Sequence, residues 1–382
     1  MSKKIGGVVA LAIMCALSLF LINCGSSSSR PSGVLYVLTE GNNNIGNNVS
    51  SFALDLGTGS LSLVNSNAST CPTTATQGNP EPCGLPLDIL LDPTGATAFV
   101  LNQGTPCVQQ GNQCVGAGSI APSIYPYTVN SDGSLSAPGT AVNWTAGSDT
   151  AVAMARDAAG QFLFVIDQGA YPPPTNCPAI GTSAQAFAGC PSITVFAMKP
   201  GSTTLSALSP FFLSKTPSAL SPITFTPPGS TSAQELLFVT NNLDICAQNC
   251  IPPSPHNDST VSIYSVSSSG VLTEVPNSPY AVAASDPVSV QAVATSPGQA
   301  TGGLFVYVGQ GAGVGALYPF QVCFVQNANC TVQDVAGNLM VPLATCPLLS
   351  CQVAPSSVGS DPAAMLVDPT NNFLYVMSSG QN

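Results

Sequence analysis

The chain has 382 residues, only 6% of them charged, and a formal net charge of −11 at pH 7. Six Lys and Arg stand against seventeen Asp and Glu. This balance argues against nucleic acid and anionic lipid headgroups as partners, because both require a basic surface. The 35 glycines and 34 prolines favour many short strands joined by turns and argue against a helical protein.

The first 24 residues have the pattern of an export signal. Lys3 and Lys4 precede an apolar run from Ile5 to Ile22, and Asn23 and Cys24 follow it. This ending resembles the lipobox of bacterial lipoproteins, which implies that Cys24 carries the lipid and becomes the mature N-terminus. Asn23 departs from the Ala or Gly that is usual in that family.

An ordinary signal peptide with an incidental cysteine, or an uncleaved N-terminal helix, is the alternative. We expect residues 1–24 to be a lipoprotein signal peptide and residues 25–33 to be a Ser-rich flexible tether. The lipid would then anchor the protein to a membrane of the bacterial cell envelope.

From residue 34 to residue 382 the sequence repeats at intervals of about 68 residues. The clearest unit is an apolar strand, here called B. Phe99, Phe164 and Val306 hold the same position in three of its copies. An apolar run that ends in a turn precedes it (A), and an alternating strand (C) and a short polar strand (D) follow. Copies of B are Val34–Gly41, Thr97–Gly104, Phe162–Gly169, Leu236–Asn242, Leu304–Gly311 and Phe373–Gly380.

Each repeat therefore predicts a four-stranded antiparallel meander in the order A-B-C-D. Apolar residues on both sides of A and B indicate burial on both faces, whereas the short polar D strand suits an outer edge. A repeated sheet of this kind is typical of a β-propeller blade. The sequence contains six B strands but only five each of A, C and D, so we expect the propeller to be incomplete at the C-terminus.

The repeat also resembles a known family. The turn Asp92–Gly95 (Asp-Pro-Thr-Gly), the strand Phe99–Asn102 (Phe-Val-Leu-Asn) and the turn Gly133–Ser136 (Gly-Ser-Leu-Ser) are similar to the lactonase family of seven-bladed propellers and to YVTN-type repeats. The resemblance covers residues 34–382 and implies seven blades, six of them visible here. It also implies a lactone hydrolase of the 6-phosphogluconolactonase type, with His and Arg residues around the channel.

Twelve cysteines that follow Cys24 form six pairs of close neighbours in sequence. An even number in an oxidising compartment, with each pair inside one connection, favours six local disulfides. Zinc is the alternative for two of the pairs because of their spacing, but His256 is the single histidine, and we expect neither metal nor cofactor. The pairs are Cys71 with Cys83, Cys107 with Cys114, Cys177 with Cys190, Cys246 with Cys250, Cys323 with Cys330, and Cys346 with Cys351.

Connections from B to C and from D to A leave one end of such a sheet, here called the loop face. All the cysteine pairs except that of Cys323 should lie there. Glu40 and Asp167, at matching positions after B strands, and the comparable Asp244 should lie at the channel mouth with Arg156, where a calcium, carboxylate or anion site is conceivable. We expect a structural role for the turn residues Asp92, Asp157 and Asp368.

The sequence offers little that points to catalysis. It contains no Gly-x-Ser-x-Gly nucleophile elbow, and no catalytic residue is assigned. The predicted function is therefore non-catalytic: a monomeric surface propeller that binds a protein, peptide or glycan through its disulfide-braced loop face. The alternative is a lactone hydrolase on the same fold, which only the family resemblance implies.

Overall fold

The computed structural model describes a set of ranges between residues 33 and 378. The predicted signal and tether, except Gly33, and His256 lie outside them. The described residues are 33–39, 47–55, 57–70, 85–103, 108–110, 113–115, 121–144, 151–169, 177, 190–226, 231–244, 259–282, 286–294, 303–311, 315–322, 340–342, 356–358, 362–367 and 373–378.

The described residues form strands and no helix, which confirms the predicted all-β class. Six antiparallel sheets follow one another along the chain, and we number them 1 to 6. Sheet 1 contains β1 (Gly33–Thr39), β2 (Asn48–Leu54) and β3 (Leu61–Ser69); sheet 2 contains β4 (Pro86–Leu91), β5 (Thr97–Asn102), β8 (Ser123–Thr128) and β9 (Val142–Asn143); sheet 3 contains β10 (Ala151–Arg156), β11 (Phe162–Asp167), β12 (Ser192–Met198), β13 (Leu205–Ala207) and β14 (Phe211–Phe212).

The remaining sheets continue the same order, and a small separate hairpin lies between β5 and β8. Sheet 4 contains β15 (Lys215–Phe225), β16 (Gln234–Asp244), β17 (Thr260–Val266), β18 (Leu272–Glu274) and β19 (Tyr280–Ala281); sheet 5 contains β20 (Pro287–Ala294), β21 (Leu304–Gln310), β22 (Ala316–Val322), β23 (Met340–Pro342) and β24 (Ser356–Ser357); sheet 6 contains β25 (Pro362–Val367) and β26 (Leu374–Ser378); the hairpin contains β6 (Val108–Gln110) and β7 (Gln113–Val115).

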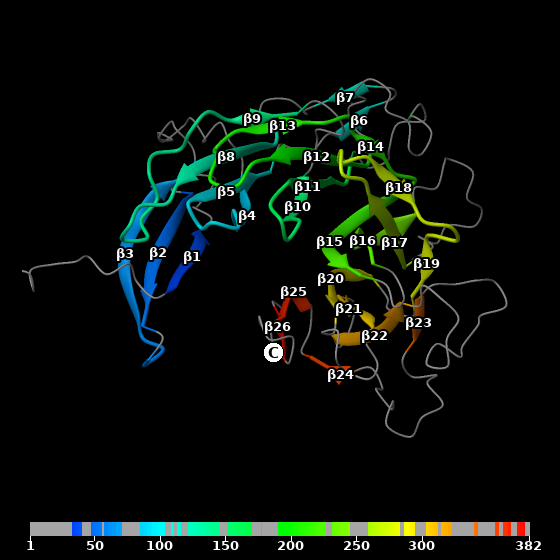
Figure 1. The fold of residues 1–382 in the computed structure, drawn as a ribbon. Coiled ribbons are helices and arrows are strands. Elements are labelled where there is room, and N and C mark those ends of the chain that lie inside the picture. The colour runs from blue at the N-terminus through cyan, green and yellow to red at the C-terminus, as the bar shows by residue number, and fades with distance from the viewer. Residues whose placement is uncertain are drawn as a thin grey trace, which may run out of the picture.

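The sheets are arranged in an arc, as Figure 1 shows, from β1–β3 in blue to β25 and β26 in red. The A strands β4, β10, β15, β20 and β25 lie on the inner side, and each contacts the next along the chain. This radial order of antiparallel sheets is that of a β-propeller. The predicted propeller architecture is therefore present in the described residues, with six B strands.

The D position differs from the sequence prediction of one weak strand. In sheets 3, 4 and 5, two short strands pair with opposite ends of the same C strand, as β13 and β14 do with β12. Pro210 lies between the two pieces in sheet 3, and Pro276 and Pro279 lie between them in sheet 4. Proline has no N–H for the ladder, so it interrupts pairing along the C strand.

Neighbouring sheets pack through alternate residues of their B strands. In β5, Ala98 and Val100 belong to the apolar cluster shared with sheet 1, whereas Phe99 and Leu101 belong to the cluster shared with sheet 3. All four side chains are completely buried. A strand with both faces covered in this way has no polar face, which explains the uninterrupted apolar runs of the B strands.

The strand pairing in sheet 5 shows that the predicted match of Val306 to Phe164 is wrong by one residue. Pro287 of β20 pairs with Gln310, just as Ala151 of β10 pairs with Asp167. Tyr307, rather than Val306, is therefore the counterpart of Phe164. The Gly-based alignment misses this because Gly169 stands two residues after Asp167, where β11 ends, whereas Gly311 directly follows Gln310, where β21 ends.

In sheets 2, 3 and 4, the leucine at the start of the D segment inserts into the contact with the preceding sheet. Leu135, Leu205 and Leu272 are 5%, 7% and 6% exposed, and each belongs to the cluster that joins its sheet to the one before it. Leu61 occupies the same position in sheet 1 and is 51% exposed. The leucine is buried by the preceding sheet and not by its own.

The turn between C and D contacts the preceding sheet as well. Gly133, Gly201 and Gly270 have positive φ angles of 87°, 75° and 80°. The Gly201 N–H donates to Asp92 Oδ2 of sheet 2 at 2.7 Å. A Cβ on Gly270 would lie 2.8 Å from the Phe162 ring of sheet 3. These turns require glycine for their backbone angle, and Gly270 requires it for the close approach too.

The first and last sheets each leave one apolar face exposed. The side chains in question alternate along β1 and β26, as the two faces of a strand do. Their counterparts in the inner sheets are buried against a neighbour. The exposed residues are Leu35, Val37 and Leu61 in sheet 1, and Leu366, Phe373, Tyr375 and Met377 in or beside sheet 6, the last four between 59% and 67% exposed.

Candidate functional site

Polar residues stand where B strands end and C strands begin, at the loop face. In sheets 2, 3 and 4 these residues face each other across the ladder and are all buried, although they follow runs of apolar residues. Burial of polar groups is costly unless they are hydrogen-bonded. The three pairs are Asn102 with Ser123, Asp167 with Ser192, and Asn241 with Thr260.

Part of this polar layer is bonded within the protein. Asn102 Nδ2 donates to the Thr70 carbonyl of sheet 1 at 3.1 Å. Asn241 Nδ2 donates to Ser262 Oγ at 3.0 Å and to Thr260 Oγ1 at 3.2 Å. These bonds use the Nδ2 atom of each amide side chain and leave its Oδ1 atom without a partner.

The remaining polar atoms of the layer are buried without a partner. Among the described residues, Asn102 Oδ1, Asn241 Oδ1, Ser123 Oγ and Ser192 Oγ make no hydrogen bond. Such atoms are rare in native proteins, where buried polar atoms are nearly always paired. We call these four residues, together with Asp167, the polar layer of the loop face.

A disulfide joins Cys177 and Cys190 beside this layer. The two Cα atoms are 5.6 Å apart, and Cys190 lies two residues before Ser192, where β12 begins. Both cysteines pack against Phe212 of β14, which is completely buried. The disulfide thus braces the end of one B–C connection against the D side of the same sheet.

This is one of the six disulfides expected from the sequence, and the other five are not among the bonds that the described residues form. Of the ten cysteines concerned, Cys114 has its backbone in β7, and nothing is described of its side chain. The pairing of the ten therefore stays a prediction. The nine that lie outside the described residues are Cys71, Cys83, Cys107, Cys246, Cys250, Cys323, Cys330, Cys346 and Cys351.

The predicted channel-mouth group is not assembled as expected. Asp167 ends β11 and is buried, and its Oδ1 accepts from the Gly169 N–H at 3.0 Å. The register places Thr39, rather than Glu40, at the position of Asp167, since Thr39 pairs with the first residue of β2. Glu40 lies outside the described residues. The match of Glu40 to Asp167 was therefore wrong by one position.

Asp244 is also displaced from the expected position. It pairs with Lys215 at the far end of β16, three residues beyond Asn241. Asn241 is the true counterpart of Asp167, because each is the B-strand partner of the first residue of its C strand. The extra length of β16 has no equivalent in β11, so sequence spacing alone could not place Asp244.

Arg156 lies at the opposite end of its sheet from Asp167. It ends β10 and pairs with Leu163, whereas the other end of β10 pairs with Asp167. Its Nε donates to the Leu91 carbonyl of sheet 2 at 2.6 Å, and its Nη1 donates to the Asp157 carbonyl at 3.1 Å. The guanidinium therefore joins two sheets and does not belong to the loop face.

Sequence reasoning missed Asp88. This residue lies on the inner strand β4, pairs with Leu101 beside the loop face, and its Oδ2 accepts from the Met154 N–H of sheet 3 at 3.4 Å. Burial raises its pKa to about 6, in spite of that hydrogen bond and one from the backbone N–H of Ile89. The repeat contained the signal, because the corresponding residues are small and uncharged: Ala153, Ala219, Ser289 and Ala364.

The turn aspartates have the structural role that the sequence predicted. Asp92 Oδ1 accepts from the Thr97 N–H at 2.9 Å, and Asp157 Oδ1 accepts from the Phe162 N–H at 2.8 Å. Each carboxylate closes the turn between its A and B strands. Asp368 lies outside the described residues.

In the described ranges no three Cys, His, Asp or Glu side chains come together as a metal would require.

The described residues contain no helix with the length and apolar character needed to cross a membrane. Residues 1–32 lie outside this description, so the lipid anchor at Cys24 remains a prediction.

Comparisons with known proteins agree on the fold. No protein-family model matches the chain, and no curated protein matches it either. Among solved structures, one named "putative 6-phosphogluconolactonase" from Bacteroides fragilis is similar at 14% identity and a TM-score of 0.53, over 92% of this chain and 75% of that one. A second, of the same name and from Bacteroides uniformis, is similar at 13% identity and a TM-score of 0.51, over 92% and 76%. The chain shares the β-propeller fold of these proteins.

Proposed function

We propose that the protein is a ligand-binding β-propeller that holds a protein, peptide or glycan on its loop face. The observation that carries the proposal is the polar layer, in which four buried oxygen atoms lack a partner within the described chain. An unpaired buried polar atom costs about 1–3 kcal/mol. A loop that rearranged around a bound ligand and bonded to these atoms would recover part of that free energy.

The disulfide between Cys177 and Cys190 supports the same proposal. It restricts the connection above sheet 3 at both of its cysteines. A connection that a disulfide restricts has less conformational entropy to lose when it contacts a ligand. Recognition loops are commonly held in this way by a rigid scaffold.

We also propose that the propeller acts at the cell envelope. Its support is the sequence alone: Lys3 and Lys4, the apolar run to Ile22, and Cys24 after it. A membrane-anchored propeller would present its loop face to extracytoplasmic ligands through the Ser-rich tether.

Ligand screening with matched variants tests the binding proposal. Purified full-length protein would be applied to a glycan array and to a displayed peptide library, together with Asn102→Ala and Asn241→Ala. We expect a bound ligand whose affinity falls at least about tenfold in both variants, since each removes a polar partner. Thr58→Ala, in the turn between β2 and β3, is the control that should bind normally. An absence of ligand, or equal binding by all variants, would contradict the proposal.

Asp88 favours a second candidate, a lactone hydrolase. A carboxyl group with a pKa of about 6 can accept and return a proton near neutral pH. As a general base, Asp88 would take a proton from water while the water oxygen attacks the lactone carbonyl. It would then return the proton to the ring oxygen as the C–O bond breaks, which yields the hydroxy acid.

A lactonase assay separates the two candidates. A panel of sugar lactones at pH 7 would be hydrolysed faster than the spontaneous rate, and Asp88→Asn would lower the enzymatic rate at least about 100-fold. Asp132→Asn, on an exposed turn at the opposite end of sheet 2, is the control. Hydrolysis at the spontaneous rate in wild-type protein would rule out the enzyme and leave the binding proposal untouched.

A further inference from the structure

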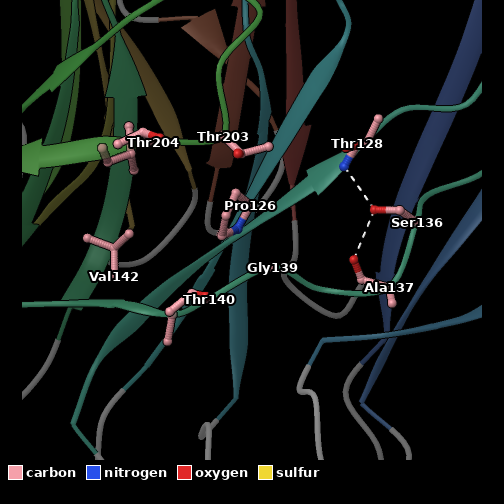
Figure 2. A pocket seen from close by; sticks show the side chains of 11 residues that line it. Pro126, Thr128, Ser136, Ala137, Gly139, Thr140, Val142, Thr203 and Thr204 are labelled. Carbon is pink, nitrogen blue, oxygen red and sulfur yellow. Dashed lines mark hydrogen bonds between the residues drawn. The ribbon is translucent and has the colours of Figure 1, made fainter.

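A groove of about 410 Å³ crosses the outer rim of the propeller between sheets 2 and 3. The C strand β8 and the segment that follows it form one wall, and the turn that precedes β13 forms the other. Figure 2 shows Pro126 in the middle of the group, with Thr203 and Thr204 on one side and Thr128 on the other. Its volume lies within the range of roughly 300–1,000 Å³ that is usual for small-molecule sites.

The groove offers free hydroxyl groups. Within the described part of the chain, the side-chain hydroxyls of Thr128, Thr140, Thr203 and Thr204 have no hydrogen-bond partner, and all four residues are exposed. Each hydroxyl can both donate and accept. Four such groups around one groove match a ligand that is itself rich in hydroxyl groups.

The lining also limits the charge of the ligand. None of the eleven lining residues is ionisable, so the groove offers no ion pair to a phosphate, a carboxylate or an amine. Pro126, Val142 and Leu205 contribute apolar carbon atoms between the hydroxyls. A neutral pyranose ring has the same alternation, with hydroxyl groups at its edge and C–H groups on its faces.

The walls are fixed before any ligand binds. The Thr128 N–H donates to Ser136 Oγ at 2.9 Å, and the Gly139 N–H donates to the Pro126 carbonyl at 2.8 Å. Across the groove, the Thr204 N–H donates to Ser202 Oγ at 3.1 Å. Threonine is β-branched, so its χ1 angle is already restricted. Little conformational entropy is therefore lost when these side chains contact a ligand.

We propose that this groove binds a neutral saccharide of one or two rings. The site is distinct from the polar layer of the loop face. Ser123 begins β8 at the loop face, whereas Thr128 ends that strand on the other side of the sheet. The proposal therefore goes beyond the proposed function and does not depend on it.

The repeat supplies a variant that the fold already accepts. Thr204 precedes Leu205 as Val271 precedes Leu272 in sheet 4, and Val271 is exposed. Thr204→Val thus removes a hydroxyl and leaves the shape that the chain itself uses elsewhere. Thr203→Val removes a second hydroxyl group, on the residue before it. Thr273→Val, at the exposed position of the D strand β18, is the matched control.

Saturation-transfer NMR on the full-length protein, with lactose, maltose, cellobiose and trehalose as probes, tests the proposal. At least one disaccharide should bind, with an affinity about tenfold weaker in the Thr203→Val, Thr204→Val double variant and unchanged in Thr273→Val, at equal melting temperatures. No binding by any of the four, or equal binding by the double variant, overturns the proposal. Binding that is lost in Asn241→Ala but kept in the double variant assigns the sugar to the loop face, and overturns it too.

Discussion

The hydroxyl of Tyr36 donates a hydrogen bond of 2.9 Å to the backbone carbonyl of Gly133, 97 residues further along the chain. Tyr36 lies on the B strand of sheet 1, and Gly133 lies in the C–D turn of sheet 2. The bond therefore joins two neighbouring sheets at the end away from the loop face. Tyr375, at the same position in sheet 6, is exposed and serves as its internal comparison.

Removal of this hydroxyl should weaken the contact between sheets 1 and 2. We expect Tyr36→Phe to lower the free energy of unfolding by about 0.5–1.5 kcal/mol, the usual net value of a hydrogen bond. Tyr375→Phe should have no effect. Urea denaturation followed by fluorescence measures both, and equal losses in the two variants would contradict the assignment.

The same tyrosine predicts a pH dependence. Burial, and to a smaller extent the charge of Asp132, raises the pKa of Tyr36 to about 12, above the ordinary value near 10. The unfolded chain therefore loses this proton at lower pH than the folded protein, so stability should fall as the pH rises from about 10 to 12. In Tyr36→Phe that part of the decline should be missing from a series of melting temperatures.

The D-segment leucines test the packing between sheets. Leu135→Ala should cost about 2–5 kcal/mol, because it opens a cavity in the contact with sheet 1. Leu61→Ala, at the same position in sheet 1, should change stability by less than about 0.5 kcal/mol, as exposed substitutions usually do. Chemical denaturation of the two variants gives the comparison. Similar losses would show that the leucine is needed by its own sheet.

The turn glycines allow a sharper version of the same comparison. Gly59 and Gly270 have positive φ angles of 70° and 80°, so alanine at either position carries a backbone cost of roughly 1–2 kcal/mol. A Cβ on Gly270 would overlap Leu208 and Phe162, whereas nothing lies within 4 Å of one on Gly59. Gly270→Ala should therefore have a clearly lower melting temperature than Gly59→Ala. Equal temperatures would mean that the turn does not contact sheet 3 in solution.

Asp88 should make the protein less stable at neutral pH than at mildly acidic pH. Its pKa is raised to about 6 in the folded protein, while the ordinary value is near 3.9. Folding thus favours the protonated form, and the stabilisation present below pH 4 is lost as the pH rises to about 6. Asp88→Ala should remove this decline and raise the melting temperature at pH 7. A pH series of both proteins would reveal whether another group is responsible.

The lipid anchor is tested by fractionation. Cys24→Ala, or inhibition of lipoprotein signal processing, should move the protein from the membrane fraction to the soluble fraction, because no acyl chain is then attached. The Cys15→Ala variant, within the apolar run, is the control that should stay with the membrane. If Cys24→Ala fractionates like wild type, the lipobox interpretation is wrong.

The strands could be predicted because burial on both faces leaves a strong local pattern. Phe99 and Val100 face opposite sides of sheet 2 and are both buried, so the repeat of apolar runs survives throughout the chain. The pairing of strands is less visible. Gly169 lies two residues beyond the end of β11 and Gly311 only one residue beyond the end of β21, so an alignment on the glycines selects Val306 in place of Tyr307.

The candidate site was harder to predict than the fold. Arg156 ends its strand as expected, but the direction of β10 takes it away from Asp167, and its partner is the Leu91 carbonyl of another sheet. Asp88 was visible as a carboxylate where the other repeats have Ala or Ser, yet its significance depends on Met154 of the next sheet. A contact between sheets that only one repeat makes, such as that of Asp88 with Met154, leaves no periodic trace in one sequence.

The Leu61 and Leu135 comparison has a consequence for how such a chain can change in length. Every inner sheet presents one kind of face to its predecessor and the other kind to its successor, so the contact is directional and the same at each step. Duplication or loss of one whole repeat, such as residues 151–212, would join faces that already fit each other. The number of sheets can therefore vary through unequal recombination without a new interface, while insertion of part of a repeat would place two faces of the same kind against each other.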